Sequence, residues 1–426
     1  MTSANQTGVP AAGALAPYRV LDLTCERGWL AGRMLADLGA CVIKLEPPGG
    51  DPGRRRGPFF TDQVDPEHCL RWWFLNRGKQ SVTCDLRAPA GRALFERLLT
   101  EVDLVLESFT PGELAGMGVE VEQVCERFPK LVWTSITPFG QTGPHAHFQG
   151  PDLIQVALGG SLHLTGDPER APVRVAVPQA DLHGSAEGAA ASLIALYHAG
   201  RTGHGQRVDV ASQLCVVRAL MNATPFPRLE GRDLVRQGIW NETAGFRRRA
   251  VYACADGYLS LMLNGGVLGG HTVRALLAWA EETMEVPLQL LEADWTQLDF
   301  SEVIRNPAKA ELFTNLSEFL VEFFLQHDKE TLYLGALERR ILLAPVNTVA
   351  DIRADEQLRA RGYFDAVDHG ELGEVHYPGA WAKLSNTPLQ NTPRAPRIGE
   401  HNQAVYGGLL GIEVAEMVDL ADAGAL

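Results

Sequence analysis

The sequence predicts an α/β protein with a large Rossmann-like domain, built on a parallel sheet, and a smaller α+β domain. Strand-like and helical segments alternate through the first 140 residues, which is typical of a mostly parallel sheet covered on both faces. A chain of 426 residues with 46% hydrophobic content is long enough for two or three domains. Because breakers and charges gather after residue 222, we place the large domain at 1–221, linkers and the small domain at 222–362, and a returning segment at 363–426.

The first half of the chain supplies the expected sheet. Apolar and β-branched segments predict strands at 18–24, 41–46, 81–86, 103–109 and 130–139, with helices at 29–39 and 89–102. The dinucleotide fingerprint G-x-G-x-x-G does not follow the first strand, where Cys25, Glu26, Arg27 and Gly28 stand instead. This removes the main sequence argument for a bound dinucleotide.

A long helix is expected from about Asp181 to His198. Its predicted buried face consists of Ala186, Ala190, Leu193, Ile194 and Tyr197, which recur every three or four residues. Asp181 stands at its start, where an Asp commonly accepts bonds from unpaired helix N–H groups. The alternative is functional, because small neighbours would leave room for a bulky ligand beside this carboxylate; they are Ala180, Gly184, Ser185 and Gly188.

The second half changes character after Val210. Residues 213–223 extend the helical region, and the irregular stretch that follows predicts a linker at 224–245. Two strands are expected around the turn at Asp256 and Gly257, followed by helices at 272–282 and 316–327. A second linker at 344–363 leads to a strand within 373–384, and the tail at 396–412 reads as a turn and a closing helix.

Charge and cysteine usage exclude several function classes. The formal charge of −14 and the pI near 5.4 argue against nucleic acid as the main partner. Seven scattered cysteines without a C-x-x-C spacing favour neither disulfides nor a structural zinc site, and we expect no metal. Residues 1–17 lack the pattern of a signal peptide, and no stretch of eighteen apolar residues follows, so we expect a cytoplasmic protein without membrane contact.

An ordered series of motifs resembles a known family. The motifs include "RVLDLT", "LADLGACVIKLEPPGGD", "NRGKQSVTCDL", "DLVLESFTPGELAGMGV", "TPFGQTGP", "PDLIQVALGGSLHLTG", "ADLHGSAEGAAASLIALYHAGRTGHGQRVDVAS" and "PRIGEH". Together they resemble the family III CoA-transferases of the CaiB/BaiF type, which include formyl-CoA transferase and carnitine CoA-transferase. The resemblance covers nearly the whole chain.

The resemblance implies that Asp181 is a nucleophile. In the family this carboxylate attacks an acyl-CoA to give a mixed anhydride, and the released CoA thiolate then forms an enzyme-bound thioester that is passed to an acceptor acid. We expect the carboxylate to be ionised, with an unperturbed pKa near ~3.9, and free of competing partners. CoA is then a substrate, and no permanently bound cofactor is implied.

The same match implies where CoA lies. The expected contacts are Cys25, Glu26, Arg27, Gly28, Arg77, Lys79, Ser108, Phe109, Thr137 and Phe139. The alternative for each is a loop residue that shapes the end of the sheet. Arg27 can pair with a carboxylate of the acyl group, and together with Arg247–Arg249 it favours a dicarboxylate substrate. The arginines at 54–56 are either solvated or near a ligand, and the aromatic residues at 72–74 belong to the core or line the substrate site.

Departures from the family pattern keep other readings open. The run of four glycines that covers the site in formyl-CoA transferase is missing, and the glycine-rich stretch at 264–271 lies after the strand instead. Pro47 and Gly116 stand where some relatives have basic CoA contacts. An α-methylacyl-CoA racemase, with Asp152 in its acid–base pair, is the alternative reaction, although Asp152 also suits a helix cap. A CoA-binding subunit is the third reading. The family fold implies an interlocked homodimer, and a hetero-oligomer with a related subunit is the alternative. The sequence does not identify the acyl donor or the acceptor acid.

Overall fold

The computed structural model describes residues 13–220, 223–243, 246–298, 300–390 and 392–426. The predicted domain boundary at 221–222 and most of the segment at 1–17 lie outside these ranges. The chain forms two compact units. The first runs to Leu162 and resumes at Val175–Gly231 and Gln357–Leu426, and the second comprises His163–Arg174 and Arg232–Glu356.

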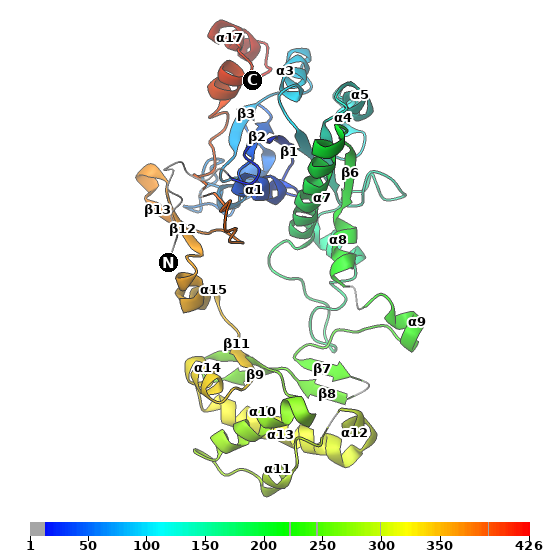
Figure 1. Cartoon of the computed structure of the whole chain (residues 1–426), viewed down its shortest axis with the longest axis vertical. Coiled ribbons are helices and arrows are strands. Elements are labelled where there is room, and N and C mark those ends of the chain that lie inside the picture. Colours follow the sequence, from blue (N-terminus) through cyan, green and yellow to red (C-terminus); the bar gives the residue numbers. More distant parts are fainter. Residues whose placement is uncertain (1–12, 221–222, 244–245, 299, 391) are drawn as a thin grey trace. The chain divides into compact units, whose positions relative to one another are not determined.

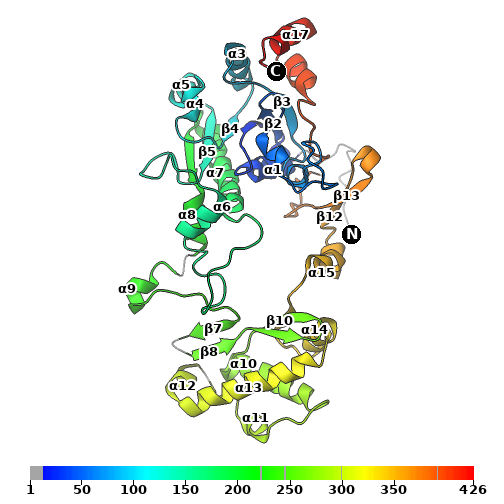
Figure 2. The same cartoon turned by 180° about the vertical axis from the view of Figure 1, so that it is seen from behind.

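A six-stranded parallel sheet forms the centre of the first unit (Figures 1 and 2). Its strands are β1 (Arg19–Leu23), β2 (Cys41–Glu46), β3 (Gln80–Thr83), β4 (Leu104–Glu107), β5 (Val132–Thr137) and β6 (Arg207–Ala211). The spatial order is β3-β2-β1-β4-β5-β6, so the chain changes direction across the sheet between β1 and β4. In open α/β sheets, ligands bind beyond the carboxyl ends of the strands at such a switch point.

Helices cover both faces of this sheet, as the alternating sequence pattern predicts. Neighbouring strand residues point to opposite faces, so that Val20 packs in one core and Leu21 in the other. The first core includes α1 (Trp29–Asp37) and α7 (Ala180–Thr202), and the second includes α3 (Pro89–Leu99), α5 (Val121–Arg127) and residues of the closing segment. The predicted α/β class with a Rossmann-like sheet is therefore confirmed.

The buried face of α7 differs from the prediction. Ile194 and Tyr197 are 70% and 65% exposed in this chain, whereas the buried positions are mostly small: Ala180, Gly184, Ser185, Gly188, Ala189, Ser192, Ala195 and Leu196. A Cβ added at Gly184 would lie 2.1 Å from Ser212 Oγ, and one at Gly188 would lie 2.6 Å from Ile136 Cδ1. These glycines therefore allow α7 to pack against its neighbours, and the expectation that they leave room for a ligand is wrong.

Shorter elements complete the first unit. They are η1 (Pro52–Arg55), α2 (Leu70–Leu75), α4 (Glu113–Gly116), α6 (Asp152–Leu158), α8 (Ser212–Ala219), α9 (Phe226–Glu230), α16 (Glu356–Ala360), β12 (Phe364–Asp368), η2 (Gly370–Leu372), β13 (Glu374–Pro378), η3 (Gln403–Leu409) and α17 (Val414–Asp422). Two of the predictions need correction here. Residues 207–211 form the sixth strand, which the sequence pattern does not predict. The expected linker at 224–245 contains α9 and the strand β7 (Trp240–Thr243).

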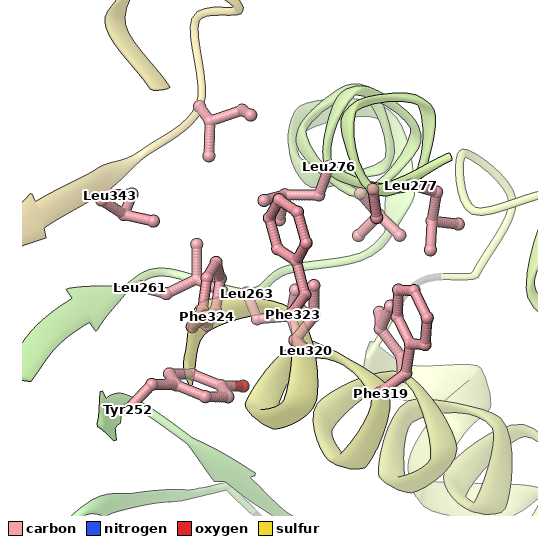
Figure 3. Packing of buried hydrophobic residues seen from close by; sticks show 14 of the residues in the cluster. Tyr252, Leu261, Leu263, Leu276, Leu277, Phe319, Leu320, Phe323, Phe324 and Leu343 are labelled. Carbon is pink, nitrogen blue, oxygen red and sulfur yellow. The ribbon is translucent and has the colours of Figure 1, made fainter. Parts of the chain in front are cut away.

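The second unit has its own core, shown in part in Figure 3. The predicted hairpin around Asp256 and Gly257 is present as two antiparallel strands, and a third strand extends that sheet. The remaining elements are β8 (Phe246–Arg249), β9 (Val251–Cys254), β10 (Gly257–Leu261), α10 (Gly266–Ala280), α11 (Leu288–Glu292), α12 (Phe300–Arg305), α13 (Pro307–Leu325), α14 (Lys329–Glu338), β11 (Leu343–Pro345) and α15 (Val349–Ala354). In Figure 3, Phe319, Leu320 and Phe323 on α13 lie in the same cluster as Leu276 and Leu277 on α10.

Within the described residues, no helix combines the length and the apolar character that crossing a membrane requires.

Candidate active site

A pocket of about 270 Å³ opens at the carboxyl ends of β1 to β4, next to the switch point of the sheet. Cys25 and Arg27 reach it from the loop after β1, and Ser108 and Phe109 from the loop after β4. The structure thus brings together residues from two of the predicted loops. Because parallel strands end at one edge, Cys25 and Ser108 become neighbours here although they are 83 positions apart in the sequence.

Hydrogen bonds fix these two loops against each other. The Cys25 N–H donates to Ser108 Oγ at 2.8 Å, and the Ser108 hydroxyl lies 3.2 Å from Cys25 Sγ. Arg27 Nη2 donates to the Ser108 carbonyl oxygen at 3.1 Å, while Arg27 Nε has no hydrogen-bond partner among the described residues. The guanidinium of Arg27 therefore retains a buried donor that has no partner among the described residues.

Asp181 is not among the residues that line this pocket, although it lies close enough to Arg27 for the charge of Arg27 to lower its pKa. It is the second residue of α7, whose N-cap position is occupied by Gln179, and none of the described backbone N–H groups donates to the Asp181 side chain, so the capping interpretation is wrong. The Ser185 hydroxyl, one turn further along α7, donates to the Arg27 carbonyl oxygen at 2.6 Å. This bond ties the start of α7 to the loop that lines the pocket.

The expectation of an isolated carboxylate with an ordinary pKa is also wrong. Gln155 Nε2, on α6, donates to Asp181 Oδ1 at 3.1 Å. Burial raises the pKa of Asp181 to about 6, and the negative charge of Asp152 adds to that increase. The bond from Gln155 and the charges of Arg27 and Arg71 act in the opposite direction. A group with this pKa is still about nine-tenths ionised at pH 7.

Asp152 stabilises the helix that carries Asp181. It lies in the first turn of α6, and its Oδ1 accepts a 2.7 Å bond from the Ala180 N–H, the first residue of α7. A carboxylate at a helix N-terminus is favourable because the N–H groups there carry partial positive charge. Asp152 therefore accepts a hydrogen bond from the start of a helix, as expected of a capping residue, but that helix is α7 and not α6, which carries Asp152.

Lys79 and Arg77, both expected to contact CoA, are buried in the protein. Lys79 Nζ donates to Asp22 Oδ2, the Trp29 carbonyl oxygen and Asn76 Oδ1 at 2.7, 2.8 and 2.8 Å, which uses all the hydrogens of its ammonium. Arg77 Nη2 donates to the Thr392 carbonyl oxygen at 2.7 Å. These placements favour structural roles for both residues.

The other predicted contacts have varied surroundings. Glu26 pairs with Arg56 at 2.8 Å and lies 3.6 Å from Arg71. Gly28 begins α1, where a Cβ would meet the Thr24 side chain at 2.5 Å. Thr137 is fully buried and its hydroxyl accepts a bond from the Gly140 N–H, and the Phe139 ring meets the His145 ring edge-on at 5.8 Å.

Sequence reasoning missed three residues of this region. Gln155 contacts Asp181, Arg71 faces it, and the exposed Arg87 lines the pocket after β3. A signal for Arg87 was present, because a cation directly after a predicted strand reaches the same edge of the sheet as Cys25. For Gln155 no such signal existed, since its contact with Asp181 depends on how α6 packs beside α7.

The arginine clusters separate into different roles. Arg54 is fully buried, forms a paired contact with Glu46 at 2.7 and 2.8 Å, and lies 3.6 Å from the Trp72 ring, so it is structural. Trp72 and Trp73 belong to a buried cluster, which confirms the core interpretation for both. Arg247 and Arg249 lie in the second unit, each beside the Trp240 ring.

Comparisons with known proteins agree with one another. A family model described as CoA-transferase family III matches residues 15–402. The chain is 35% identical over 392 residues to the succinyl-CoA:(R)-benzylsuccinate CoA-transferase subunit BbsE of Thauera aromatica, with 91% of this chain and 92% of the relative covered. It is 32% identical over 406 residues to the succinate–glutarate CoA-transferase of Agrobacterium fabrum, with 94% and 96% covered.

A solved structure has the same fold. The crystal structure of a CaiB/BaiF family protein from Brucella suis matches with a TM-score of 0.78 at 30% identity, over 93% of this chain and 100% of that chain.

Proposed function

Because the chain belongs to CoA-transferase family III, as its sequence motifs predict and the match over residues 15–402 confirms, we propose that Asp181 is the nucleophile of a CoA transfer between two carboxylic acids. Homologues across its length are CoA-transferases, so the protein is a transferase. The observation that carries the proposal is the Asp181 carboxylate, which has one oxygen without a hydrogen-bond donor among the described residues. One turn further along the same helix, the Ser185 hydroxyl donates to the Arg27 carbonyl oxygen, in the loop that lines the pocket.

The reaction we propose uses this free oxygen. Oδ2 of Asp181 attacks the thioester carbonyl carbon of the acyl-CoA, the C–S bond breaks, and CoA leaves as a thiolate. The thiolate then attacks Cγ of the aspartyl anhydride and releases the first acid as its carboxylate. The acceptor carboxylate attacks the resulting enzyme–CoA thioester at the same carbon. A second anhydride forms, and the thiolate returns to the acyl carbon of the new acid.

We propose that part of CoA occupies the pocket at the carboxyl ends of β1 to β4. Arg87 lines it and supplies positive charge for phosphate groups, while Cys25, Arg27, Ser108 and Phe109 form its wall. Glu26, Gly28, Thr137 and Phe139 remain predicted contacts from the family match. The buried bonds of Arg77 and Lys79 favour a supporting role for these two residues, which precede β3.

A dicarboxylate is the substrate class that the site supports best. Arg27 lies close enough to Asp181 for its charge to lower the pKa of that carboxyl, so the same positive charge can attract a second carboxylate of the substrate. The relatives from Thauera and Agrobacterium are named for benzylsuccinate, succinate and glutarate, which all carry two carboxylates. A panel of mono- and dicarboxylic acceptors tests this part, and a strict preference for monocarboxylates would remove it.

The assembly we propose is an interlocked homodimer. The apolar side chains of Ile194, Tyr197 and Leu214 on α7 and α8 are exposed in the single chain, and exposed apolar residues of this kind favour a protein partner. A hetero-oligomer with a related chain is the alternative, because the Thauera relative is itself named as a subunit. No observation favours the racemase reaction, since the Asp152 carboxylate holds the start of α7.

The test combines trapping and substitution. The wild-type protein is incubated with succinyl-CoA, treated with hydroxylamine or borohydride, and digested, and the modified peptide is mapped by mass spectrometry. We expect the modification at Asp181. Asp181→Asn keeps the shape of the side chain but is a far weaker nucleophile, so it should bind CoA and lose transfer by at least about 10³-fold.

Asp328→Asn is the matched control. Asp328 caps α14 through a 2.7 Å bond from the Thr331 N–H, and Asn is an equally good cap, so this variant should transfer CoA normally. An adduct on another residue with Asp181 unmodified, or full activity in Asp181→Asn, would overturn the proposed function.

A further inference from the structure

Gln155 is a fully buried polar side chain on α6 that contacts the proposed nucleophile. Its Nε2 donates to the Gly150 carbonyl oxygen at 2.7 Å and to Asp181 Oδ1 at 3.1 Å. Both neighbours are acceptors, so the amide can face them only with its nitrogen, and the two hydrogens of the NH₂ group are both used. The orientation of this amide is therefore fixed.

The other end of the amide has no partner. Oε1 of Gln155 is buried and accepts no hydrogen bond from the described residues, which is costly for a buried carbonyl oxygen. An Ile or Leu at this position would avoid that cost. The contacts that a Gln gains here, and that an apolar residue would lose, are the bonds to the Gly150 carbonyl oxygen and to Asp181, and only the second reaches the proposed nucleophile.

We propose that Gln155 is a catalytic residue that binds Oδ1 of Asp181, leaves Oδ2 as the attacking oxygen, and donates to the negative charge that develops on Oδ1. This inference rests on the proposed function, because it assigns a role to each oxygen of the same nucleophile. Gln155 lies within the motif "PDLIQVALGGSLHLTG", but the sequence alone predicts no role for this side chain.

The charge on Oδ1 follows from the electron balance. When the CoA thiolate attacks Cγ of the anhydride, the C=O electron pair moves onto Oδ1, and its return expels the acid together with Oδ2. The same charge forms when the acceptor carboxylate attacks the enzyme–CoA thioester, and there its return expels the thiolate. A donor that is already in place stabilises such a charge without having to reorient. Gln155 Nε2 is in place through its second bond to Gly150.

The charged groups around Asp181 come from several elements. Asp152 faces it from α6 and raises its pKa, whereas Arg27 after β1 and Arg71 on α2 lower it. The bond from Gln155 also lowers this pKa, because it stabilises the ionised form. Removal of Gln155 should therefore shift the pH at which Asp181 becomes reactive, while a residue that only fills space would not.

The experiment measures the single-turnover rate of adduct formation from succinyl-CoA between pH 5 and 8, in the wild type and in Gln155→Met. Met has a similar length and no donor. We expect the rate at pH 8 to fall by about 10²-fold and the midpoint of the pH profile to rise by about one unit. The acyl-CoA concentration that gives half of the maximal rate should change by less than about threefold.

Gln213→Met is the matched control. Gln213 Nε2 donates to the Leu158 carbonyl oxygen at 3.2 Å, away from Asp181, so this variant should keep the wild-type rate and midpoint. If Gln155→Met does not fold, Gln155→Leu answers the same question, because its side chain also lacks a donor and suits a buried helix position.

The outcomes separate the two proposals. Absence of any adduct on Asp181 in the wild type would overturn the proposed function. A normal adduct in the wild type, with the rate of Gln155→Met within threefold of it or slowed without a change in midpoint, would overturn only the role of Gln155.

Discussion

At the residue scale, burial and charge act in opposite directions on Asp181. Burial and the neighbouring Asp152 favour the protonated acid, while Gln155, Arg27 and Arg71 favour the carboxylate. The result is a pKa of about 6, which leaves the group ionised at neutral pH but poorly hydrated. A carboxylate with few hydrogen bonds to water is a better nucleophile than a fully solvated one. The environment therefore increases reactivity at the expense of stability.

The first prediction is a pH dependence of the chemical step. Because only the ionised carboxylate attacks, the rate of adduct formation should fall about tenfold per pH unit below about pH 6, and should be level between about pH 7 and 8. The rate is measured with succinyl-CoA alone, so that ionisation of the acceptor acid does not contribute. A midpoint near the ordinary Asp value, around pH 4, would contradict the raised pKa.

The second prediction concerns stability. The folded-state pKa of Asp181 lies above its unfolded value, so the native state binds the proton more tightly, and stability falls as the pH rises from about 4 to about 6. Asp181→Asn removes this effect. The variant should be more stable than the wild type at pH 7 by about 1 to 3 kcal/mol, and the difference should vanish near pH 4.

Urea unfolding at both pH values measures this difference, with Asp328→Asn as the control that should show no such pH-dependent gain. A loss of stability in Asp181→Asn at pH 7 would mean that the carboxylate stabilises the fold instead.

The residues of the site differ in how well the sequence predicts them. Cys25, Arg27, Ser108 and Phe109 were expected and do meet at one pocket, because each follows a parallel strand and position along a strand can be read from its pattern. Gln155 and Arg71 were not expected, since their relation to Asp181 is set by side-chain packing between helices. The roles of Arg77 and Lys79 depend on burial, which their motif does not reveal.

At the element scale, α7 shows why its buried face was assigned wrongly. A hydrophobicity pattern selects Ile194 and Tyr197, yet the helix packs through glycine, alanine and serine. Small residues let a helix approach a sheet and a neighbouring helix closely, but they contribute little to an apolar pattern. The strand at 207–211 was missed for a related reason, because it is short and alternates polar with apolar residues beside the long helix.

The third prediction tests this packing. Gly184→Ala places a Cβ about 2.1 Å from Ser212 Oγ, so α7 or α8 must shift, and we expect a loss of about 1 to 3 kcal/mol in the free energy of unfolding. Gly200→Ala, on the same helix, places a Cβ 3.8 Å from the Tyr18 hydroxyl oxygen and should be stabilising by up to about 1 kcal/mol. Thermal or urea unfolding of both variants measures the contrast, and equal effects would contradict the close packing.

At the scale of the whole molecule, the closing segment is fastened to the central sheet of the first unit. Asn402 Nδ2 donates to Thr83 Oγ1 at 2.9 Å, the Tyr406 hydroxyl donates to the Thr83 carbonyl oxygen at 2.7 Å, and the Gly399 N–H donates to Ser81 Oγ at 2.9 Å. The chain therefore leaves the first unit at Gly231 and returns to it from Gln357 onward. A chain that leaves a unit and later returns to it is compatible with the interlocked dimer proposed above.

The last prediction follows from that path and from the exposed face of α7. If Ile194 and Tyr197 are covered by a second copy, Ile194→Asp should weaken the free energy of dimer formation by more than about 1.5 to 3 kcal/mol. Burial of an isoleucine contributes about that much, and in the variant a charge must be buried as well. Leu337→Asp, at 57% exposure on α14, is the control and should be nearly neutral.

Sedimentation and circular dichroism are followed together over a dilution series. An interlocked dimer cannot separate while it stays folded, so the wild type should lose dimer and helical signal at the same point, and Ile194→Asp should do so at a higher concentration. Folded monomers in either protein would contradict the interlocked arrangement, whereas an unchanged dimer in Ile194→Asp would place the interface on another face of the chain.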